Sequence, residues 1–463
     1  MKKGFLIAFL FLINSTHARE LFQYNLENNE KLESTYTAEF TNGKTIHFAV
    51  IKNTASKNYF LTPFLVDKNN HVQKMDRYVS KKLLEIKSYH SNKNNATITA
   101  YDSDGKELHV IDYDFNTGKI RSKTQALLSA PDNIFRLIDR TVLVAFDKKE
   151  NRLKVNSILD SDYNKLTEIA VPKDKIKLFN KLIEETPESI NQEEFVENGS
   201  ISKRKGYILN SNLIYTLEKD KNETQVFNFD LSKTNDFTYA TLNSSFAKET
   251  KDISNYFVED KIIFLGVNKQ SIQIKIISAL DLKEIKKINF NLDSNAQIKS
   301  ELLEDYIKTA LKSSMKSTIA INKTKNNGFA FILDNVISAT YSYNYNWFFH
   351  HQFMLQQQMM QQQMMMQNAR SFGPSAYEPF DFSLVTKDKK NIPIQFVLDA
   401  NLNFIDGSNS ETIYPKIDRD TYLEKFKDDK SIKKFSTAFT NNEIRYIYQN
   451  SKSKAIIINV EKL

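Results

Sequence analysis

The residues with the most distinctive chemistry form a methionine- and glutamine-rich stretch, FMLQQQMMQQQMMMQNAR, at Phe353–Arg370. It holds six of the nine methionines of the chain, and His350 and His351 lie just before it. Thioethers are soft ligands that suit Cu(I), and the histidines could add imidazole ligands. The methionine clusters recur every five residues, which on a helix moves each cluster about 140° around the axis, and on a strand adjacent methionines alternate between faces. We therefore expect a low-complexity loop, with a partner-docking element or Cu(I) ligation as alternatives.

Paired carboxylates are the other candidates for chemistry, because glycoside hydrolysis uses two carboxyl groups held at a fixed separation. Such pairs occur at Glu193 and Glu194, at Glu259 and Asp260, and at Asp418 and Asp420. Proximity in the sequence does not set a separation in space. We therefore interpret all three pairs as solvated surface carboxylates.

The sequence DSDG at Asp102–Gly105 resembles part of a calcium-binding EF-hand loop, in which glycine stands at the sixth position. That alignment places Ala100 and Ile111 at the two anchoring positions, and neither side chain ligates calcium. An Asp-Gly pair between two alternating strands is instead typical of a tight hairpin turn. His109 alternates with apolar neighbours in the second of these strands, so we interpret it as a solvent-facing or hydrogen-bonded strand residue.

Several familiar catalytic and binding motifs are missing from the sequence. It contains no glycine-rich phosphate loop, no dinucleotide fingerprint, no HExxH and no GxSxG. It also contains no cysteine, which excludes disulfides, zinc–thiolate sites and thiol nucleophiles. The sequence therefore predicts no catalytic, cofactor-binding or metal-ligating residues, and no cofactor.

The N-terminal residues MKKGFLIAFLFLINSTHA have the three parts of a secretory signal peptide. Lys2 and Lys3 precede an apolar run of ten residues, and Thr16 and Ala18 form a small-residue cleavage site. We expect residues 1–18 to be removed and the mature chain to be exported to the periplasm or the exterior; a buried N-terminal helix is the alternative. No later stretch approaches the roughly 18 apolar residues of a membrane span, so none is expected in the mature chain.

Charge is distributed along the chain, with 64 basic and 56 acidic residues and a formal net charge of +8 at pH 7. Most basic residues lie near acidic ones, as in KEIKK at Lys283–Lys287. A nucleic-acid-binding protein normally gathers its positive charge on one face or in one segment. We therefore expect a solvated surface and no nucleic-acid partner.

A recurring unit organises most of the chain: a short apolar strand, a polar turn, an alternating strand and a turn that contains aspartate. One copy runs from Ile262–Leu265 to Asp281, and another from Leu213–Leu217 to Asp230. Period-two alternation between polar turns is typical of antiparallel hairpins. Three insertions interrupt the units, at about 172–200 and 296–312, where apolar residues recur at helical spacing, and at 343–376 around the Met/Gln tract.

Without these insertions the chain is long enough for about seven units of about 50 residues, which is typical of propeller blades. Stacked blades cover each other's faces, which a single four-stranded sheet cannot do alone. In this respect the chain resembles secreted bacterial β-propeller proteins, and the architectural resemblance covers most of the mature chain. It implies an all-β fold: a β-propeller-like array of about six to eight antiparallel blades with short helical insertions, in one domain over residues 19–463. Tandem β-sandwiches are the alternative.

A propeller is a rigid platform whose loops carry specificity, and the fold alone names no ligand. The sequence therefore predicts a non-catalytic binding or scaffold protein for an unidentified protein, peptide or glycan, in an undefined oligomeric state. One alternative is a carbohydrate-active hydrolase or lyase that uses carboxylates at the propeller mouth, and a second is Cu(I) binding by the Met-rich insertion. Carboxylates that converge with an arginine or histidine in one pocket would favour the enzyme.

Overall fold

The computed structural model describes residues 18–337 and 392–463. Within these ranges it leaves out residues 128–129, 221–222, 234–236, 247–248, 280, 295–296, 407–410, 418, 420–421, 424–425, 427–428 and 441. The predicted signal peptide, apart from Ala18, and the insertion at 343–376 lie outside the described residues. The chain divides into two compact units, which are described separately. Unit 1 comprises Met1–Leu84, Phe115–Ile120 and Ile417–Leu463, and unit 2 comprises Glu85–Asp114 and Arg121–Lys416.

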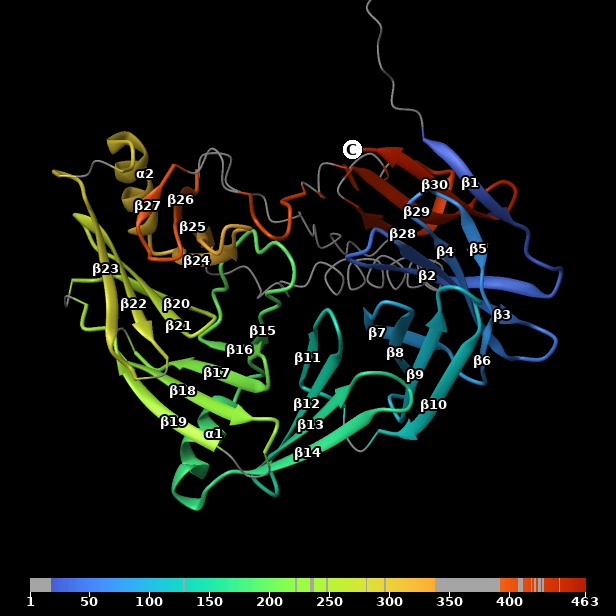
Figure 1. Cartoon of the computed structure of the whole chain (residues 1–463), viewed down its shortest axis with the longest axis horizontal. Coiled ribbons are helices and arrows are strands. Elements are labelled where there is room, and N and C mark those ends of the chain that lie inside the picture. The colour runs from blue at the N-terminus through green and yellow to red at the C-terminus, as the bar shows by residue number, and fades with distance from the viewer. Residues whose placement is uncertain are drawn as a thin grey trace, which may run out of the picture. The chain divides into compact units, whose positions relative to one another are not determined.

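Unit 1 contains two antiparallel sheets (Figure 1). The first has the order β2-β3-β4-β5, with β6 also paired to β4; the second has the order β1-β30-β29-β28. Their bounds are β1 Arg19–Tyr24, β2 Glu30–Glu39, β3 Thr45–Asn53, β4 Tyr59–Val66, β5 Val72–Lys74, β6 Tyr78–Ser80, β28 Ile432–Phe439, β29 Glu443–Asn450 and β30 Ile456–Lys462. The N-terminal strand β1 thus pairs with the C-terminal strand β30, with Tyr24 opposite Ile456.

Unit 2 contains five sheets, whose strand orders are β10-β9-β8-β7, β11-β12-β13-β14, β15-β16-β17-β18-β19, β20-β21-β22-β23 and β24-β25-β26-β27. In the first two sheets the strands are β7 Leu84–Ser91, β8 Asn95–Asp102, β9 Glu107–Asp114, β10 Ile120–Ala126, β11 Asn133–Arg136, β12 Thr141–Asp147, β13 Arg152–Ile158 and β14 Asn164–Ala170. In the third they are β15 Glu188–Ser189, β16 Arg204–Leu209, β17 Asn212–Glu218, β18 Glu223–Asp230 and β19 Phe237–Asn243. The last two contain β20 Asp252–Val258, β21 Lys261–Val267, β22 Ser271–Ser278, β23 Glu284–Asn291, β24 Met315–Lys323, β25 Phe329–Ile337, β26 Ile394–Leu398 and β27 Phe404–Ile405. Leu84 and Ile120, at the ends of β7 and β10, belong to unit 1.

Asparagine and aspartate shape many of the turns between these strands, which explains how a chain with only 10 glycines can form so many hairpins. Between β21 and β22, the Asn268 side chain accepts hydrogen bonds from the backbone N–H groups of Gln270 and Ser271, each at 2.8 Å. Asn151 and Asn327 adopt positive φ angles of 52° and 58°. Asparagine tolerates this left-handed conformation better than other non-glycine residues.

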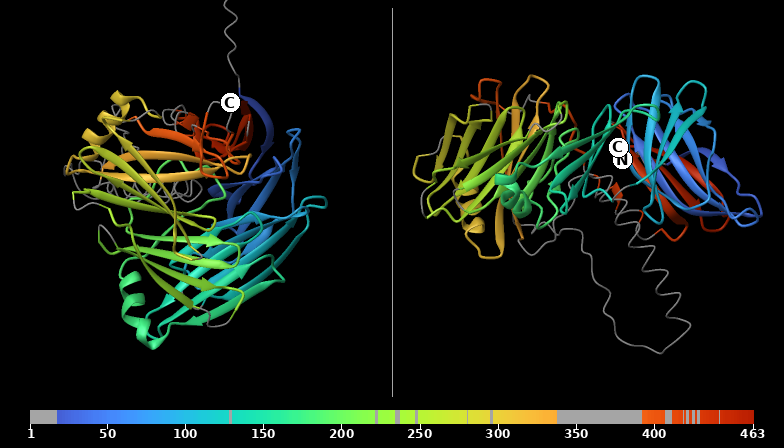
Figure 2. Two further views of the ribbon diagram at one scale, coloured as in Figure 1. Left: turned by 60° about the vertical axis from the view of Figure 1, so that its left-hand side comes forward. Right: turned by 90° about the horizontal axis from the view of Figure 1, so that it is seen from below.

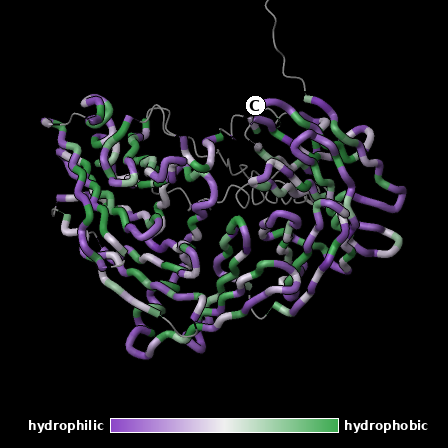
Figure 3. Tube along the Cα trace, viewed as in Figure 1, coloured by the Kyte–Doolittle hydropathy of each residue, from purple (hydrophilic) through white to green (hydrophobic). Residues whose placement is uncertain are grey.

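The inner strands of the sheets in unit 2 are buried on both faces, whereas outer strands such as β10 and β14 are largely exposed. Along β21, for example, Ile262, Phe264 and Leu265 are completely buried, although adjacent residues point to opposite faces. Hydrophobic segments follow the strands, and hydrophilic segments follow many of the turns (Figure 3). This double burial explains why several strands are continuous apolar runs instead of alternating ones.

Helices α1 (Ile176–Leu182) and α2 (Ser300–Ala310) each lie within a segment that the sequence predicts to be a helical insertion. A 3-10 turn at Lys173–Lys175 leads into α1 (Ile176–Leu182), whose Phe179 and Leu182 are completely buried. The remainder of the insertion at 172–200 is not helical; it contains the short strand β15 and an irregular loop. The second helix, α2 (Ser300–Ala310), contacts β24, β25 and β26 (Figures 1 and 2). Neither helix is long and apolar enough to cross a membrane, and the described part of the chain has no other candidate.

The fold is all-β and propeller-like, as the sequence predicts. The described residues form seven sheets, within the expected range of six to eight, and most follow the chain order without interruption. Strands of a sandwich would instead be exchanged between two sheets by Greek-key connections. First strands of successive sheets lie near each other, as β20 and β24 do in unit 2 and β2 and β28 do in unit 1. The single domain over residues 19–463 stays a prediction.

Candidate ligand-binding cavity

A cavity of about 360 Å³ lies in unit 2, where two short strands at sheet edges face each other. One side is formed by residues 131–137, which include β11, and the other by residues 186–193, which include β15. Ser202 and Ile208 complete the lining. The second wall belongs to the non-helical part of the insertion that follows α1. The insertion therefore builds one wall of a cavity in addition to connecting two sheets.

Glu188 is the most deeply buried carboxyl group of this cavity, with 8% of the residue exposed. The Ser200 hydroxyl donates a hydrogen bond of 2.6 Å to its Oε2 atom. Its Oε1 atom is buried and has no hydrogen-bond partner among the described residues. Burial raises the pKa of Glu188 to about 7, although the Ser200 hydrogen bond and the charge of Lys205 act in the opposite direction. Near neutral pH this carboxyl group is therefore divided between its neutral and charged forms.

Gly199 fixes the position of the loop that carries Ser200. A Cβ atom at residue 199 would lie 2.4 Å from the backbone nitrogen and oxygen of Ile319 in β24. Only glycine permits this close approach of two backbones. The hydrogen bond from Ser200 to Glu188 therefore depends on how the loop packs against a different sheet.

Glu193 and Glu194 are not solvated surface carboxylates, so that interpretation of the sequence is wrong. Glu194 is 8% exposed and lies 3.5 Å from a guanidinium nitrogen of Arg136. The side chain of Asn191 turns the pair inward, since its Oδ1 accepts from the Glu193 N–H at 3.0 Å and its Nδ2 donates to Glu194 at 3.1 Å. Such turns are local features that sequence proximity does not reveal.

Glu193 lines the cavity, whereas Glu194 is held by Arg136. The Oε2 atom of Glu193 is buried and lacks a hydrogen-bond partner in the described part of the chain. Burial raises the pKa of Glu193 to about 7. Glu188 and Glu193 therefore both have carboxyl groups that gain or lose a proton near neutral pH. Groups with strongly shifted pKa values are concentrated at functional sites.

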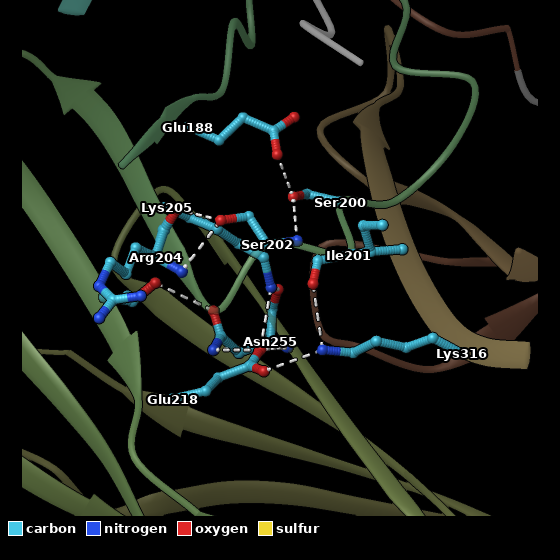
Figure 4. A network of polar contacts seen from close by, with 10 residues as sticks. Glu188, Ser200, Ile201, Ser202, Arg204, Lys205, Glu218, Asn255 and Lys316 are labelled. Atoms are coloured by element: carbon cyan, nitrogen blue, oxygen red, sulfur yellow. Dashed lines mark hydrogen bonds and ion pairs between the residues drawn. The ribbon is translucent and has the colours of Figure 1, made fainter. Parts of the chain in front are cut away.

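A buried ion network lies next to Glu188 and joins four strands of three sheets (Figure 4). Glu218 of β17 accepts hydrogen bonds from the Nζ atom of Lys205 at 3.0 Å and from the side-chain amide of Asn255 at 2.9 Å. The Nζ atom of Lys316 lies 3.4 Å from the other oxygen of Glu218. Lys205 also donates to the backbone oxygen of Asn255 at 3.0 Å. These contacts connect β16, β17, β20 and β24.

Two ammonium groups surround one carboxylate in this network. Burial alone would raise the pKa of Glu218, but Lys205 and Lys316 together lower it below its ordinary value. Glu218 is therefore charged, and its donors satisfy it. Glu218 and Glu188 therefore differ. The charge of Glu218 is compensated by two lysines, whereas the Oε1 atom of Glu188 has no hydrogen-bond donor among the described residues.

Other residues that the sequence singles out have structural environments. Glu259 lies 2.6 Å from Lys323 and Asp260 lies 2.5 Å from Lys261, so this pair forms ion pairs in the turn between β20 and β21. His109 is buried, with its Nδ1 atom 3.2 Å from the Thr124 hydroxyl.

The DSDG segment forms the predicted hairpin turn between β8 and β9, in which Asp102 accepts from the backbone N–H of Lys106 at 2.7 Å. Asp418, Asp420, His350, His351 and the Met/Gln tract lie outside the described residues. Cu(I) binding by the tract therefore stays a prediction.

No family model and no curated protein matches this chain. Among solved structures, the WD40 domain of SCAP from fission yeast is 7% identical over 96% of this chain and 98% of that chain, with a TM-score of 0.30. The β-propeller domain of the Trilobed protease from Pyrococcus furiosus is 8% identical over 93% of this chain and 94% of that chain, with a TM-score of 0.32. The description of the fold therefore rests on the sheets of this chain itself.

Proposed function

We propose that this protein is an exported binding protein and that the cavity beside Glu188 takes up a small polar ligand. One observation carries the proposal: two carboxyl groups that line the same cavity, Glu188 and Glu193, each keep a buried oxygen without a hydrogen-bond partner. Leaving such an atom unsatisfied costs about 1–3 kcal/mol. A ligand that donates hydrogen bonds to these oxygens would recover that free energy.

The rest of the cavity suits binding as well. Its lining combines apolar side chains, such as Ile134 and Ile190, with polar and charged residues, which make up more than half of the lining. Ligand sites are usually concave, and their polar groups set the orientation of the ligand, so this lining favours a polar ligand. The volume of about 360 Å³ is at the lower end of the range of about 300–1,000 Å³ for such sites, which favours a small molecule or a single side chain as the ligand.

A variant that fills the cavity tests this proposal. Thr186 lines the cavity but is exposed, so Thr186→Trp should block the cavity with little effect on folding. Thr238→Trp, at an exposed position of β19, is the matched control. The purified protein would be screened by calorimetry against polysaccharides, peptidoglycan, peptides and small metabolites. We expect a ligand that binds the wild type and the control but not Thr186→Trp; binding that is equal in all three would contradict the proposal.

A second candidate function is hydrolysis or elimination on a glycan. The observation that favours it is the convergence of Glu188, Glu193 and Arg136 on one cavity, with both carboxyl pKa values near 7. A carboxyl group with a raised pKa can act as a general acid near neutral pH. Turnover of a polysaccharide that is abolished in Glu188→Gln or Glu193→Gln would establish an enzyme, whereas binding without turnover would leave the first proposal.

Export is the part of the proposal that rests on the sequence alone. The N-terminal residues 1–18 have the composition of a signal peptide. N-terminal sequencing of the protein from fractionated cells should give Arg19 as the first residue, in the periplasmic or extracellular fraction. An intact Met1 in the cytoplasmic fraction would refute export.

A further inference from the structure

We infer that the ligand of the cavity carries a primary ammonium group, or a similar organic cation, which the carboxylates of Glu188 and Glu193 accept. The inference rests on the proposed binding function, because it names the chemical class of the ligand for that same cavity. Three observations on the described residues support it: which hydrogen-bonding groups of the cavity are engaged, which charges surround the two carboxyls, and how deeply Glu188 is buried.

Each of the three side-chain amides that line the cavity already donates one hydrogen bond within the protein. Asn133 donates to the backbone oxygen of Pro187 at 2.6 Å, and Asn191 donates to Glu194 at 3.1 Å. Gln192 donates to the backbone oxygen of Phe257. Of the three carboxyl groups in the lining, Asp132 is exposed and accepts a hydrogen bond from the backbone N–H of Phe146 at 2.7 Å. The buried carboxyl atoms without a partner among the described residues are Glu188 Oε1 and Glu193 Oε2, which are acceptors when these groups are ionised. The site therefore calls for a ligand that donates, and an ammonium group donates three hydrogen bonds.

The charges around Glu188 leave it without a close cationic partner. It lies on β15 and receives a hydrogen bond from the neutral hydroxyl of Ser200. Lys205 of β16 is the charged group that acts on it, but the Lys205 ammonium is bound to Glu218, with Lys316 on the far side of that carboxylate. Figure 4 shows the Ser200 hydroxyl at Glu188, with both lysines directed at Glu218. An added cation in the cavity would therefore not duplicate an existing ion pair.

Glu193 has both acidic and basic groups around it, and these charges also allow a cationic ligand to bind beside its carboxylate. Asp139 disfavours ionisation of Glu193, while Arg136 and Arg140 favour it, and the phenol of Tyr414 lies within electrostatic range. Both arginines have acidic partners of their own. Arg136 lies 3.5 Å from Glu194, and Arg140 lies 3.3 Å from Asp139.

An ammonium ligand would bind the ionised carboxylates and displace their protons. Because burial raises both pKa values to about 7 in the free protein, ligand binding should release protons near neutral pH. The apparent affinity should increase with pH up to about 7 and level off above it. Below pH 7 it should fall by about tenfold per pH unit for each carboxyl group that must ionise. A neutral polyol of the same size would show no such dependence.

The experiment compares matched cations and neutral molecules on the full mature protein. The probes are 1,5-diaminopentane against 1,5-pentanediol, and glucosamine against glucose, titrated by calorimetry at pH 5.5, 7 and 8.5. Proton release is measured by repeating the pH 7 titration in buffers with different heats of ionisation. The variants are Glu188→Gln and Glu193→Gln, with Thr186→Trp to show that binding occurs in the cavity and the exposed Glu301→Gln as a control.

We expect the amines to bind and the alcohols not to bind. Affinity should rise at least tenfold from pH 5.5 to pH 8.5, protons should be released, and Glu188→Gln should weaken binding at least tenfold. Neutral ligands that bind in the cavity while amines do not would overturn the ammonium inference but keep the proposed binding function. Amine binding that Thr186→Trp leaves intact would overturn the inference, since the site would lie elsewhere. If no compound in this panel or the wider screen binds, both proposals fail.

Discussion

Glu188→Gln should make the protein more stable at alkaline pH. Burial raises the pKa of the Glu188 carboxyl from its ordinary value of 4.5 to about 7. The folded state therefore favours the neutral form, so the stabilising effect of the proton is complete below pH 4.5 and is lost as the pH rises through 7. Each pKa unit corresponds to about 1.4 kcal/mol, so the difference between 4.5 and about 7 amounts to about 3 kcal/mol. The glutamine variant is always neutral and does not lose this free energy.

Glutamine is a suitable replacement because its side-chain oxygen can still accept the hydrogen bond that Ser200 donates to Glu188. The assay is urea unfolding followed by far-UV circular dichroism, at pH 4.5 and pH 8, for the wild type and the variant. We expect the stability difference between variant and wild type to be about 3 kcal/mol larger at pH 8 than at pH 4.5. Glu301→Gln, at an exposed position of α2, should show no comparable change. A difference between Glu188→Gln and the wild type that is the same at both pH values would refute the reasoning.

Three further predictions concern stability, each measured by chemical or thermal unfolding. Lys205→Met should destabilise the protein by about 3 kcal/mol, because Glu218 would lose its closest buried ammonium partner; a loss below 1 kcal/mol would mean that Lys316 alone compensates Glu218. Gly199→Ala should be strongly destabilising, because the added Cβ would collide with the backbone of β24. Gly105→Ala has open space around the added Cβ and should cost only about 1 kcal/mol, because of the positive φ angle at that position. Equal losses of stability in the two variants would contradict this. Deletion of Gln356–Asn368 should leave the unfolding midpoint nearly unchanged, as expected for a polar low-complexity loop, and a fall of many degrees would show that the methionines pack in a core.

The strands could be predicted from the sequence because their signal is local. Period-two alternation and polar turns mark hairpins such as β21–β22, and the aspartates that close the units fall at the ends of strands, as Asp230 does in β18. The insertion at 172–200 was predicted less well. Its first twelve residues carry an apolar helical period. The structure of the remaining residues depends on tertiary contacts that a periodicity analysis does not detect, such as the packing of Gly199 against β24.

The candidate site was missed for a related reason. Glu188 stands next to a proline in a polar segment, and its sequence neighbours give no sign of burial. What buries it is the approach of β11, about 50 residues earlier, and of the loop at Ser200. Glu218 and Lys205 likewise look like ordinary charged strand ends, although both are buried and paired. Charged residues are exposed so often that sequence reasoning assigns them to the surface by default.

The stability cost of Glu188 itself bears on its function. A buried glutamine would satisfy Ser200 without the loss of about 3 kcal/mol at alkaline pH, so a carboxyl group at this position is not the most stabilising choice. Functional sites often retain such destabilising groups because the interaction with a ligand offsets them. A bound cation would do so here by making the ionised form favourable. If this reasoning is correct, an amine ligand should raise the unfolding temperature of the wild type more at pH 8 than at pH 5.5. Its effect on Glu188→Gln should be much smaller at both pH values, because that variant binds the amine at least tenfold more weakly. If the amine stabilised the wild type and Glu188→Gln equally, the stability cost of Glu188 would have no connection with ligand binding.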